Sequence, residues 1–287
     1  MSATMSGPPH GLKPLSVTPP LNEYLATLWR RRGFATSMAA GEFQTRHANT
    51  LLGNLWYVLN PLLQLAVYWL VFGLLLSVDR GVTNFVGFLA AGIFVFQFAQ
   101  RAITGGASSI SKNLSLIRSL QFPRALLPLS AVLREALTLR IALVVVAGIL
   151  LVTGEGLTPW WLMAIPVLVL LSLFNLGGAL IAARLADRVK DIENVLPFLF
   201  RLLFYGSGVL FLADSFIGDL DNPELWRLLF VLNPLYCFVS LTRHYTMTSI
   251  TQEQVGLMWL SAGAWTLAIV VGGLLFFRAG ERTYGRG

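Results

Sequence analysis

The chain has 287 residues, of which 55% are hydrophobic and only 12% are charged, and its formal net charge is +7. Soluble domains carry about 25% charged residues, so this composition excludes an ordinary soluble globular protein. Most of the positive charges lie beside long apolar blocks, as in membrane proteins, which argues against a nucleic-acid partner. The single cysteine, Cys237, excludes an intramolecular disulfide and a multi-cysteine metal site, and we interpret it as a small packed side chain.

Two elements are predicted before the first apolar block. Residues 1–18 are rich in Pro, Ser and Thr and contain no apolar core, which predicts a disordered cytoplasmic tail rather than a signal peptide. Residues 19–33 predict a short amphipathic helix that ends in Arg30, Arg31 and Arg32 and carries an apolar stripe of Leu21, Tyr24, Leu25, Leu28 and Trp29. Such a helix suits the membrane interface, although an ordinary packed surface helix would show the same stripe.

Six apolar blocks have the length that a bilayer span requires, roughly 20 residues. They cover about 51–76, 84–104, 126–153, 158–183, 194–213 and 255–277. Asn60-Pro61 predicts a kink in the first block, because proline removes a helix hydrogen bond. The sequence therefore predicts an all-α membrane protein, with six transmembrane helices in one domain that covers residues 19–287.

Lys and Arg residues indicate the orientation of these spans. With both termini in the cytoplasm, fifteen of them lie inside: Lys13, Arg30, Arg31, Arg32, Arg46, Arg101, Lys112, Arg118, Arg124, Arg184, Arg188, Lys190, Arg278, Arg282 and Arg286. Three lie outside: Arg80, Arg227 and Arg243. The positive-inside rule therefore favours cytoplasmic termini.

The segment 225–241 is apolar enough for a further span, but Asn233-Pro234 divides it into two short halves. A seventh crossing would also move Arg278, Arg282 and Arg286 to the outside. We therefore predict a re-entrant helical segment on the outer face, between the fifth and sixth spans.

Several kinds of chemistry are missing. The chain has no G-x-x-x-x-G-K-[ST] phosphate loop, so we expect it to bind no nucleotide and to be no enzyme. His10, His47 and His244 are scattered along the chain, so we expect no histidine metal site. An outer acidic set could bind a divalent cation, although solvated loop charge explains it more simply. Its members are Asp214, Asp219, Asp221 and Glu224. Charges inside the spans indicate either function or snorkelling to the interface: Arg134, Glu135, Arg140 and Arg201.

A series of short motifs in a fixed order covers about residues 20–285. In the first half these are Glu42, Arg46, Leu52-Gly53, Trp56, Leu59-x-Pro61, Val71-Phe72-Gly73, Asn113-Leu114, Phe122-Pro123-Arg124, Leu127-Pro128 and Ser130. In the second half these are Arg188-x-x-Asp191, Leu196-Pro197 and Asn233-Pro234-Leu235. In this order, on six apolar blocks, the chain resembles the ABC-2 transporter permeases, and within them the branch that exports polysaccharides and teichoic acids on lipid carriers. One departure is Ser207-Gly208-Val209, where that family commonly has Ser-Pro-Val.

The resemblance implies a half-transporter in a bacterial cytoplasmic (inner) membrane. Two copies of the chain would form the pore as a homodimer, and two copies of a separate ATPase subunit would bind ATP and Mg. Its cargo would be a lipid-linked polysaccharide, O-antigen-like (as in lipopolysaccharide) or galactan-like. The alternatives are teichoic acid, or a drug or small lipid. A membrane enzyme for lipid-linked sugars would need catalytic carboxylates, and only Asp187 and Asp191 are placed for that.

The segment 108–121 is predicted to be the coupling helix that contacts the ATPase. Ile110, Leu114 and Ile117 share one helical face, and Ser111, Ser115 and Arg118 lie opposite. A membrane-surface connector would show the same pattern. The coupling residues are therefore expected to be Ile110, Lys112, Asn113, Leu114, Ile117 and Arg118. A second contact with the ATPase is expected at Arg188 and Asp191. A solvated turn with salt pairs would explain these two residues equally well.

Two further groups are expected to contact the cargo. Trp29 and the three arginines Arg30, Arg31 and Arg32 would lie at the substrate entrance, where guanidinium groups suit a pyrophosphate, although attraction to anionic lipid would also explain them. Aromatic rings on the first and fifth spans would line the channel, because sugar rings pack on aromatic faces; lipid contact is the alternative for each ring. The predicted channel set is Trp56, Tyr68, Trp69, Phe72, Phe204 and Tyr205.

Overall fold

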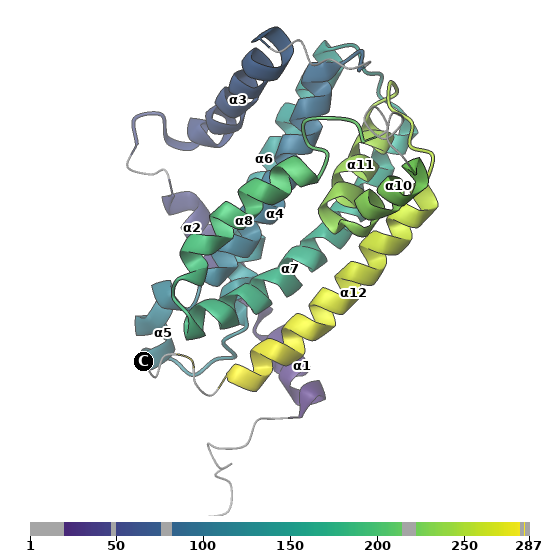
Figure 1. The fold of residues 1–287 in the computed structure, drawn as a ribbon. Coiled ribbons are helices and arrows are strands. Elements are labelled where there is room, and N and C mark those ends of the chain that lie inside the picture. Colours follow the sequence, from purple (N-terminus) through teal and green to yellow (C-terminus); the bar gives the residue numbers. More distant parts are fainter. Residues whose placement is uncertain (1–19, 47–49, 76–81, 214–221, 282–283, 285–287) are drawn as a thin grey trace, which may run out of the picture.

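The computed structural model describes residues 20–46, 50–75, 82–213, 222–281 and 284, and the regular structure in these ranges is entirely helical (Figure 1). Five of the described helices are long and apolar enough to cross a membrane, or six if one bent pair is counted as a span. The all-α membrane fold is thereby confirmed. The predicted tail 1–18 and the outer acids at 214–221 lie outside the described residues. In the part that is described, no group of three or more His, Cys, Asp or Glu side chains could hold a metal ion.

The five long helices coincide with five of the predicted spans. They are α3 (Trp56–Tyr68) with its π-helical continuation η2 (Trp69–Leu75), α4 (Phe85–Ala107), α6 (Leu126–Val152), α7 (Ala164–Arg188) preceded by the 3-10 turn η4 (Pro159–Met163), and α12 (Val255–Gly280). A short 3-10 turn, η1 (Gly53–Leu55), precedes α3, and α3 continues through Pro61. The wide π turns begin about two turns after the position where the proline predicted a kink. Such turns are frequent at functional sites.

The predicted fifth span is shorter than expected. Helix α8 runs from Ile192 to Gly206, which at 1.5 Å per residue is about 22 Å, against about 30 Å of hydrocarbon. The chain then turns at Gly208, whose φ of +62° is left-handed. A proline has φ near −65° and cannot take this conformation, so the family's Ser-Pro-Val would not fit the backbone that this chain has at Gly208. An added Cβ there would also lie 2.9 Å from the Tyr236 ring.

Helices α10 (Pro223–Leu232) and α11 (Pro234–Thr246) meet at an angle of 96°, at the predicted Asn233-Pro234 break. Asn233 makes two kinds of contact there. Its Oδ1 accepts a hydrogen bond from the backbone N–H of Leu235 at 3.0 Å, which caps α11. Its Nδ2 donates to the carbonyl of Gly206 at 3.2 Å and to the hydroxyl of Ser207 at 3.1 Å. The same residue therefore breaks the segment and joins it to the end of α8.

Helix α4 forms the centre of the bundle, because almost its whole circumference is buried. It packs against α6, α7, α8 and α11, and α12 packs along α7 (Figure 1). Small residues permit these close contacts. A Cβ on Gly177 of α7 would lie 2.5 Å from the carbonyl oxygen of Ile269 in α12, and one on Gly106 of α4 would lie 2.4 Å from the Ala179 side chain. Small residues are the usual means of close helix contact in membranes.

The N-terminal region forms two helices where one was predicted. Helix α1 (Leu21–Arg30) is amphipathic with Tyr24 buried, and α2 (Arg32–Thr45) follows after a turn at Arg31. Helix α2 packs along α6, and its buried residues on that face are Ala35 and Ala39. The i, i+4 pair of alanines makes this close contact possible. Helix α2 was not predicted because its sequence lacks the stripe of large apolar residues that indicated α1.

Candidate functional site

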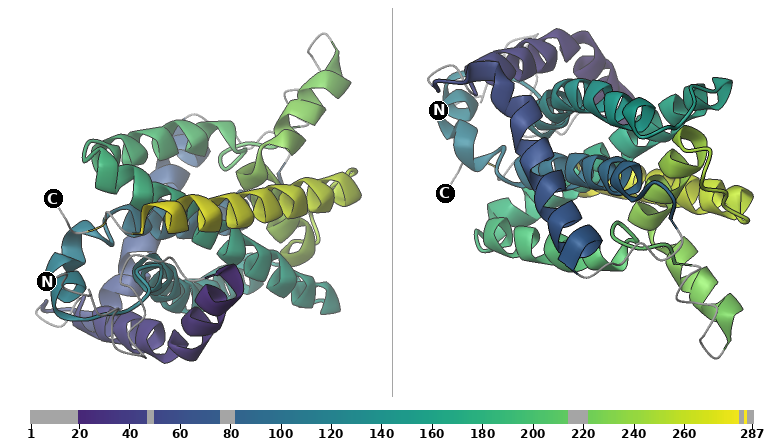
Figure 2. Two further views of the ribbon diagram at one scale, coloured as in Figure 1. Left: turned by 90° about the horizontal axis from the view of Figure 1, so that it is seen from below. Right: turned by 90° about the horizontal axis from the view of Figure 1, so that it is seen from above.

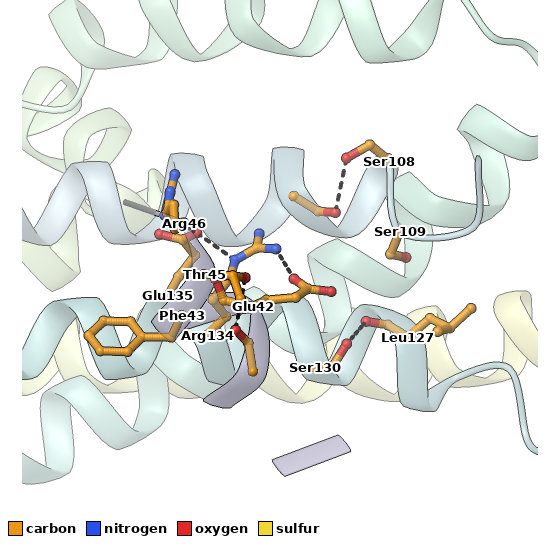
Figure 3. A network of polar contacts seen from close by, with 12 residues as sticks. Glu42, Phe43, Thr45, Arg46, Ser108, Ser109, Leu127, Ser130, Arg134 and Glu135 are labelled. Carbon is orange, nitrogen blue, oxygen red and sulfur yellow. Dashed lines mark hydrogen bonds and ion pairs between the residues drawn. The ribbon is translucent and has the colours of Figure 1, made fainter. Parts of the chain in front are cut away.

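A network of charged side chains joins the end of α2 to α6 (Figure 3). The Arg134 guanidinium donates to the carboxylate of Glu42 and, at 3.1 Å, to that of Glu135. Arg46 donates to the same Glu135 oxygen at 3.1 Å. Glu135 is 2% exposed, so its charge depends on these two cations. The span charges Arg134 and Glu135 are therefore paired inside the protein, whereas Arg140 and Arg201 are exposed.

The network borders a polar cavity of about 330 Å³ near the end of α4. Four cations, Arg46, Arg101, Lys112 and Arg134, line it together with two carboxylates, Glu135 and Glu193. A polar chain leads from the cavity toward α3: Arg101 donates to Gln97 at 2.7 Å, and Gln97 donates to Gln64. The excess of positive charge suits an anion, and guanidinium groups bind phosphate well.

The predicted coupling segment forms the 3-10 turn η3 (Ser111–Asn113) and the short helix α5 (Leu114–Ser119). Ile110 is 2% exposed, and Ile117 packs against the cluster that contains it. Ser111, Lys112, Ser115 and Arg118 are exposed, while Asn113 and Leu114 are half-buried. The segment thus attaches by its apolar face and presents its polar face outward.

The second predicted coupling contact lies beside the first. Arg188 ends α7, Asp191 precedes α8, and both are exposed. Ser111 donates to the carboxylate of Glu193 at 2.8 Å, which joins η3 to the first turn of α8. The two segments, about 80 residues apart in the sequence, therefore form one continuous surface.

The end of α12 holds the segment that follows α5. The carboxylate of Glu281 accepts a hydrogen bond from the backbone N–H of Arg124 at 2.8 Å, and the Arg124 guanidinium donates to the carbonyl of Glu281. The Tyr24 phenol of α1 lies close to the same carboxylate. Burial raises the pKa of Glu281, and the hydrogen bond from the Arg124 backbone opposes that rise. Three elements far apart in the sequence therefore meet at this carboxylate.

The four predicted entrance residues lie around the α1–α2 turn. Trp29 is 68% exposed, and the Arg32 guanidinium lies 4.3 Å from the centroid of its ring. Arg31 donates to the carbonyl of Gln121 at 2.6 Å, and Arg30 is exposed at the end of α1. The turn therefore touches the segment between α5 and α6, apart from the polar cavity, whose lining includes none of the four.

The aromatic rings of α3–η2 and α8 do meet. Tyr68 stacks on Phe204 at 5.2 Å between centroids, and Phe204 contacts Tyr205 at 5.7 Å. Phe72 lies 6.2 Å from Tyr68. Phe204 is buried within the protomer, whereas Trp69 and Tyr205 are exposed and Trp56 is half-buried. Of the predicted channel set, Trp69 and Tyr205 are the rings most available to another molecule.

Arg243 was counted among the charges on the outer side, and the structure shows that it is buried inside the bundle. It lies on α11 with 2% of its surface exposed. Its guanidinium donates to three backbone carbonyls, those of Phe88 at 3.1 Å, Gly208 at 2.7 Å and Val209 at 2.6 Å. Arg243 therefore fastens α11 to α4 and to the turn after α8.

Glu155, between α6 and η4, fastens the same end of the molecule. Its carboxylate accepts hydrogen bonds from the backbone N–H and the hydroxyl of Thr248, both at 2.7 Å, and from Ser249 at 2.6 Å. Asn84, the N-cap of α4, donates to it at 3.3 Å. Burial alone would raise the pKa of Glu155, but the hydrogen bonds outweigh burial and hold the pKa below the ordinary 4.5.

Neither the motifs nor the charges inside the spans had identified Arg101, Gln97 or Gln64 as residues of the site. The sequence does contain a pattern that points to two of them, because Gln97 and Arg101 are four residues apart and share one face of an otherwise apolar helix. Gln64 lies within another apolar span. Polar side chains placed this way inside apolar spans generally face protein or water rather than lipid.

Comparison with known proteins adds independent information. The family model described as "ABC-2 type transporter" matches residues 35–247. The chain is 28% identical over 219 residues to the O-antigen export system permease protein RfbA of Myxococcus xanthus, which covers 76% of this chain and 80% of that one. A Klebsiella pneumoniae protein of the same name is 26% identical over 222 residues, 77% of this chain and 83% of its own. The polysialic acid transport protein KpsM of Escherichia coli is 26% identical over 246 residues, 84% and 90% of the two chains.

Proposed function

The chain belongs to the ABC-2 type transporter family, and from that premise we propose that it is the membrane-spanning permease of an exporter for a lipid-linked polysaccharide. The observation that carries the proposal is the cavity lined by Arg46, Arg101, Lys112 and Arg134. Its excess of cations suits a phosphate-bearing head group. Similarity to O-antigen and polysialic acid permeases over most of the chain supports a glycan as the rest of the cargo.

The proposed complex contains two copies of this chain and two copies of a separate ATPase, which binds ATP and Mg. The ATPase docks on the exposed polar face of η3–α5 and on the adjacent start of α8. The Ser111–Glu193 hydrogen bond supports this, because it holds both segments in one surface. The exposed residues available to the ATPase are Lys112, Ser115, Arg118, Arg188 and Asp191.

The proposed topology has six crossings with both termini in the cytoplasm of a bacterial inner membrane. Helix α8 is too short to cross alone, and its end joins Asn233 at the corner of the α10–α11 pair. A re-entrant α10–α11 pair would supply the remaining depth on the outer side. In a Cys237→Ser background, Lys112→Cys should be unreactive to a membrane-impermeant maleimide added outside, and Thr251→Cys should react. Strong labelling at position 112 would contradict this topology.

The function is tested by deleting the gene in its host. We expect loss of the surface glycan and accumulation of lipid-linked glycan on the inner leaflet, with rescue by the native chain. Arg101→Glu should fail to rescue, because it reverses a charge in the cavity. Arg140→Glu is the matched control, since Arg140 is an exposed arginine on α6 outside the cavity. A deletion strain with normal surface glycan and increased sensitivity to apolar compounds would instead indicate a drug or small-lipid exporter.

A further inference from the structure

A second and larger cavity lies on another side of the protomer. It is an apolar groove of about 630 Å³ beneath the α1–α2 turn, closed on its other sides by α6, α7 and α12. Leu25 and Leu28 of α1, Leu129 at the start of α6, Leu176 of α7 and Leu274 of α12 line it. Its volume is within the range of ligand sites, about 300–1,000 Å³.

The position of the groove determines which medium fills it. Helices α6, α7 and α12 are candidate membrane spans, and α1 lies across them as an amphipathic helix. Figure 2 shows α1 and α8 on opposite sides of α12, so the groove is separate from the aromatic contact between α3 and α8. Candidate spans form three of its sides, which puts the groove at the depth of the bilayer if these helices cross it, and lipid chains would cover an apolar surface of this size there.

One end of the groove carries a fixed positive charge. Arg32 lines the groove and donates to the carbonyl of Trp29 at 3.0 Å, with its guanidinium over the Trp29 ring. Neither contact neutralises the charge, and Arg30 and Arg31 are next to it in the sequence. Trp and Arg side chains are typical of the membrane interface, and basic pockets between transmembrane helices bind anionic lipid head groups.

We propose that this groove binds an anionic glycerophospholipid of the surrounding leaflet. One acyl chain occupies the groove between α1, α6, α7 and α12, and the phosphate lies at Arg32. The lipid thereby attaches α1 to the bundle at a place where protein side chains leave a space. This site is distinct from the cation-lined cavity and from the aromatic rings on α3 and α8.

The test is native mass spectrometry of the delipidated full-length chain with dioleoyl phosphatidylglycerol or dioleoyl phosphatidylcholine. We expect one phosphatidylglycerol to remain bound where phosphatidylcholine does not. Leu129→Trp fills the groove and should abolish this binding. Arg32→Gln should reduce the preference for phosphatidylglycerol by about tenfold, the effect of losing one charged contact, whereas Arg32→Lys should retain most of it.

The control is Leu267→Trp, an equal change at an exposed position of α12 outside the groove, which should leave binding unchanged. Melting temperatures of all variants verify that they remain folded. Equal binding of the two lipids, or phosphatidylglycerol binding that survives Leu129→Trp, would overturn the proposal. Displacement of phosphatidylglycerol by a polyprenyl phosphate at lower concentration would also overturn it, since the groove would then hold the cargo carrier.

Discussion

Replacing Arg243 with leucine should loosen the end of the bundle where α11 packs against α4. The guanidinium is the common partner of α11, α4 and the turn at Gly208–Val209. Leucine fills much of the same volume but donates no hydrogen bond. The sequence makes room for the arginine at Gly92, where an added Cβ would lie 2.1 Å from Nη2 of Arg243.

The expected loss of folding stability follows from the hydrogen bonds that the three carbonyls lose. The carbonyl of Phe88 is inside α4 and keeps its intrahelical bond, so its loss is small. The carbonyls of Gly208 and Val209 are in the turn and are left buried without this donor, at about 1–3 kcal/mol each. The substitution also removes the desolvation cost of burying a cation, which offsets part of this loss, so we expect the free energy of unfolding to fall by about 3 kcal/mol.

Cys237 provides the assay, because it is on α11, has 0% of its surface exposed and is the chain's single cysteine. Its labelling by a maleimide in detergent reports how often α11 separates from the bundle. A loss of about 3 kcal/mol should raise the labelling rate by about a hundredfold. Gly92→Ala should act in the same direction, whereas Gly148→Ala, which has open space around its Cβ, should not. If Arg243→Leu labelled Cys237 at the native rate, Arg243 would not fasten these elements.

Four further perturbations test other contacts. Glu135→Gln removes the shared partner of Arg46 and Arg134, but Arg46 is partly exposed and Arg134 keeps Glu42, so we expect a loss of stability of about 1–3 kcal/mol in chemical denaturation. Because the folded pKa of Glu155 is lowered, its stabilisation is present above about pH 4.5 and is lost as pH falls below that value; Glu155→Gln should remove this pH dependence from the melting temperature. Ser115→Trp, on the exposed face of α5, should reduce copurification of the ATPase and ATP hydrolysis without changing the melting temperature. Trp69→Ala and Tyr205→Ala should each slow glycan export modestly and together nearly abolish it, since stacking contributes about 1–3 kcal/mol per ring; one ring that alone stops export would indicate a compact pocket instead.

Local sequence patterns predicted much of this fold. Apolar blocks located the long helices, Pro123 separates α5 from α6, and Asn233-Pro234 separates α10 from α11. The apolar face of 108–121 includes Ile110, which is buried as that pattern requires. These features depend on residues close together in the sequence, so periodicity and backbone restrictions are sufficient to predict them.

What the sequence did not reveal depends on partners far away in the chain. The buried position of Arg243 was not predicted, because its acceptors are backbone carbonyls, which no side-chain pattern records. The boundary of α8 was placed too late, since the apolar run continues past the left-handed turn at Gly208. Helix α2 was not predicted, because its contact with α6 involves Ala35 and Ala39 rather than a stripe of large apolar residues.

The most direct test of polysaccharide export is transport in proteoliposomes that contain this chain and its ATPase. The cargo is a labelled lipid-linked glycan in the outer leaflet, and the measurement is ATP-dependent protection of its sugars from an external glycosidase. We expect protection that requires ATP, that Arg101→Glu abolishes and that Arg140→Glu leaves unchanged. ATP hydrolysis without protection of the glycan, together with ATP-dependent movement of a small labelled lipid, would contradict the proposed function.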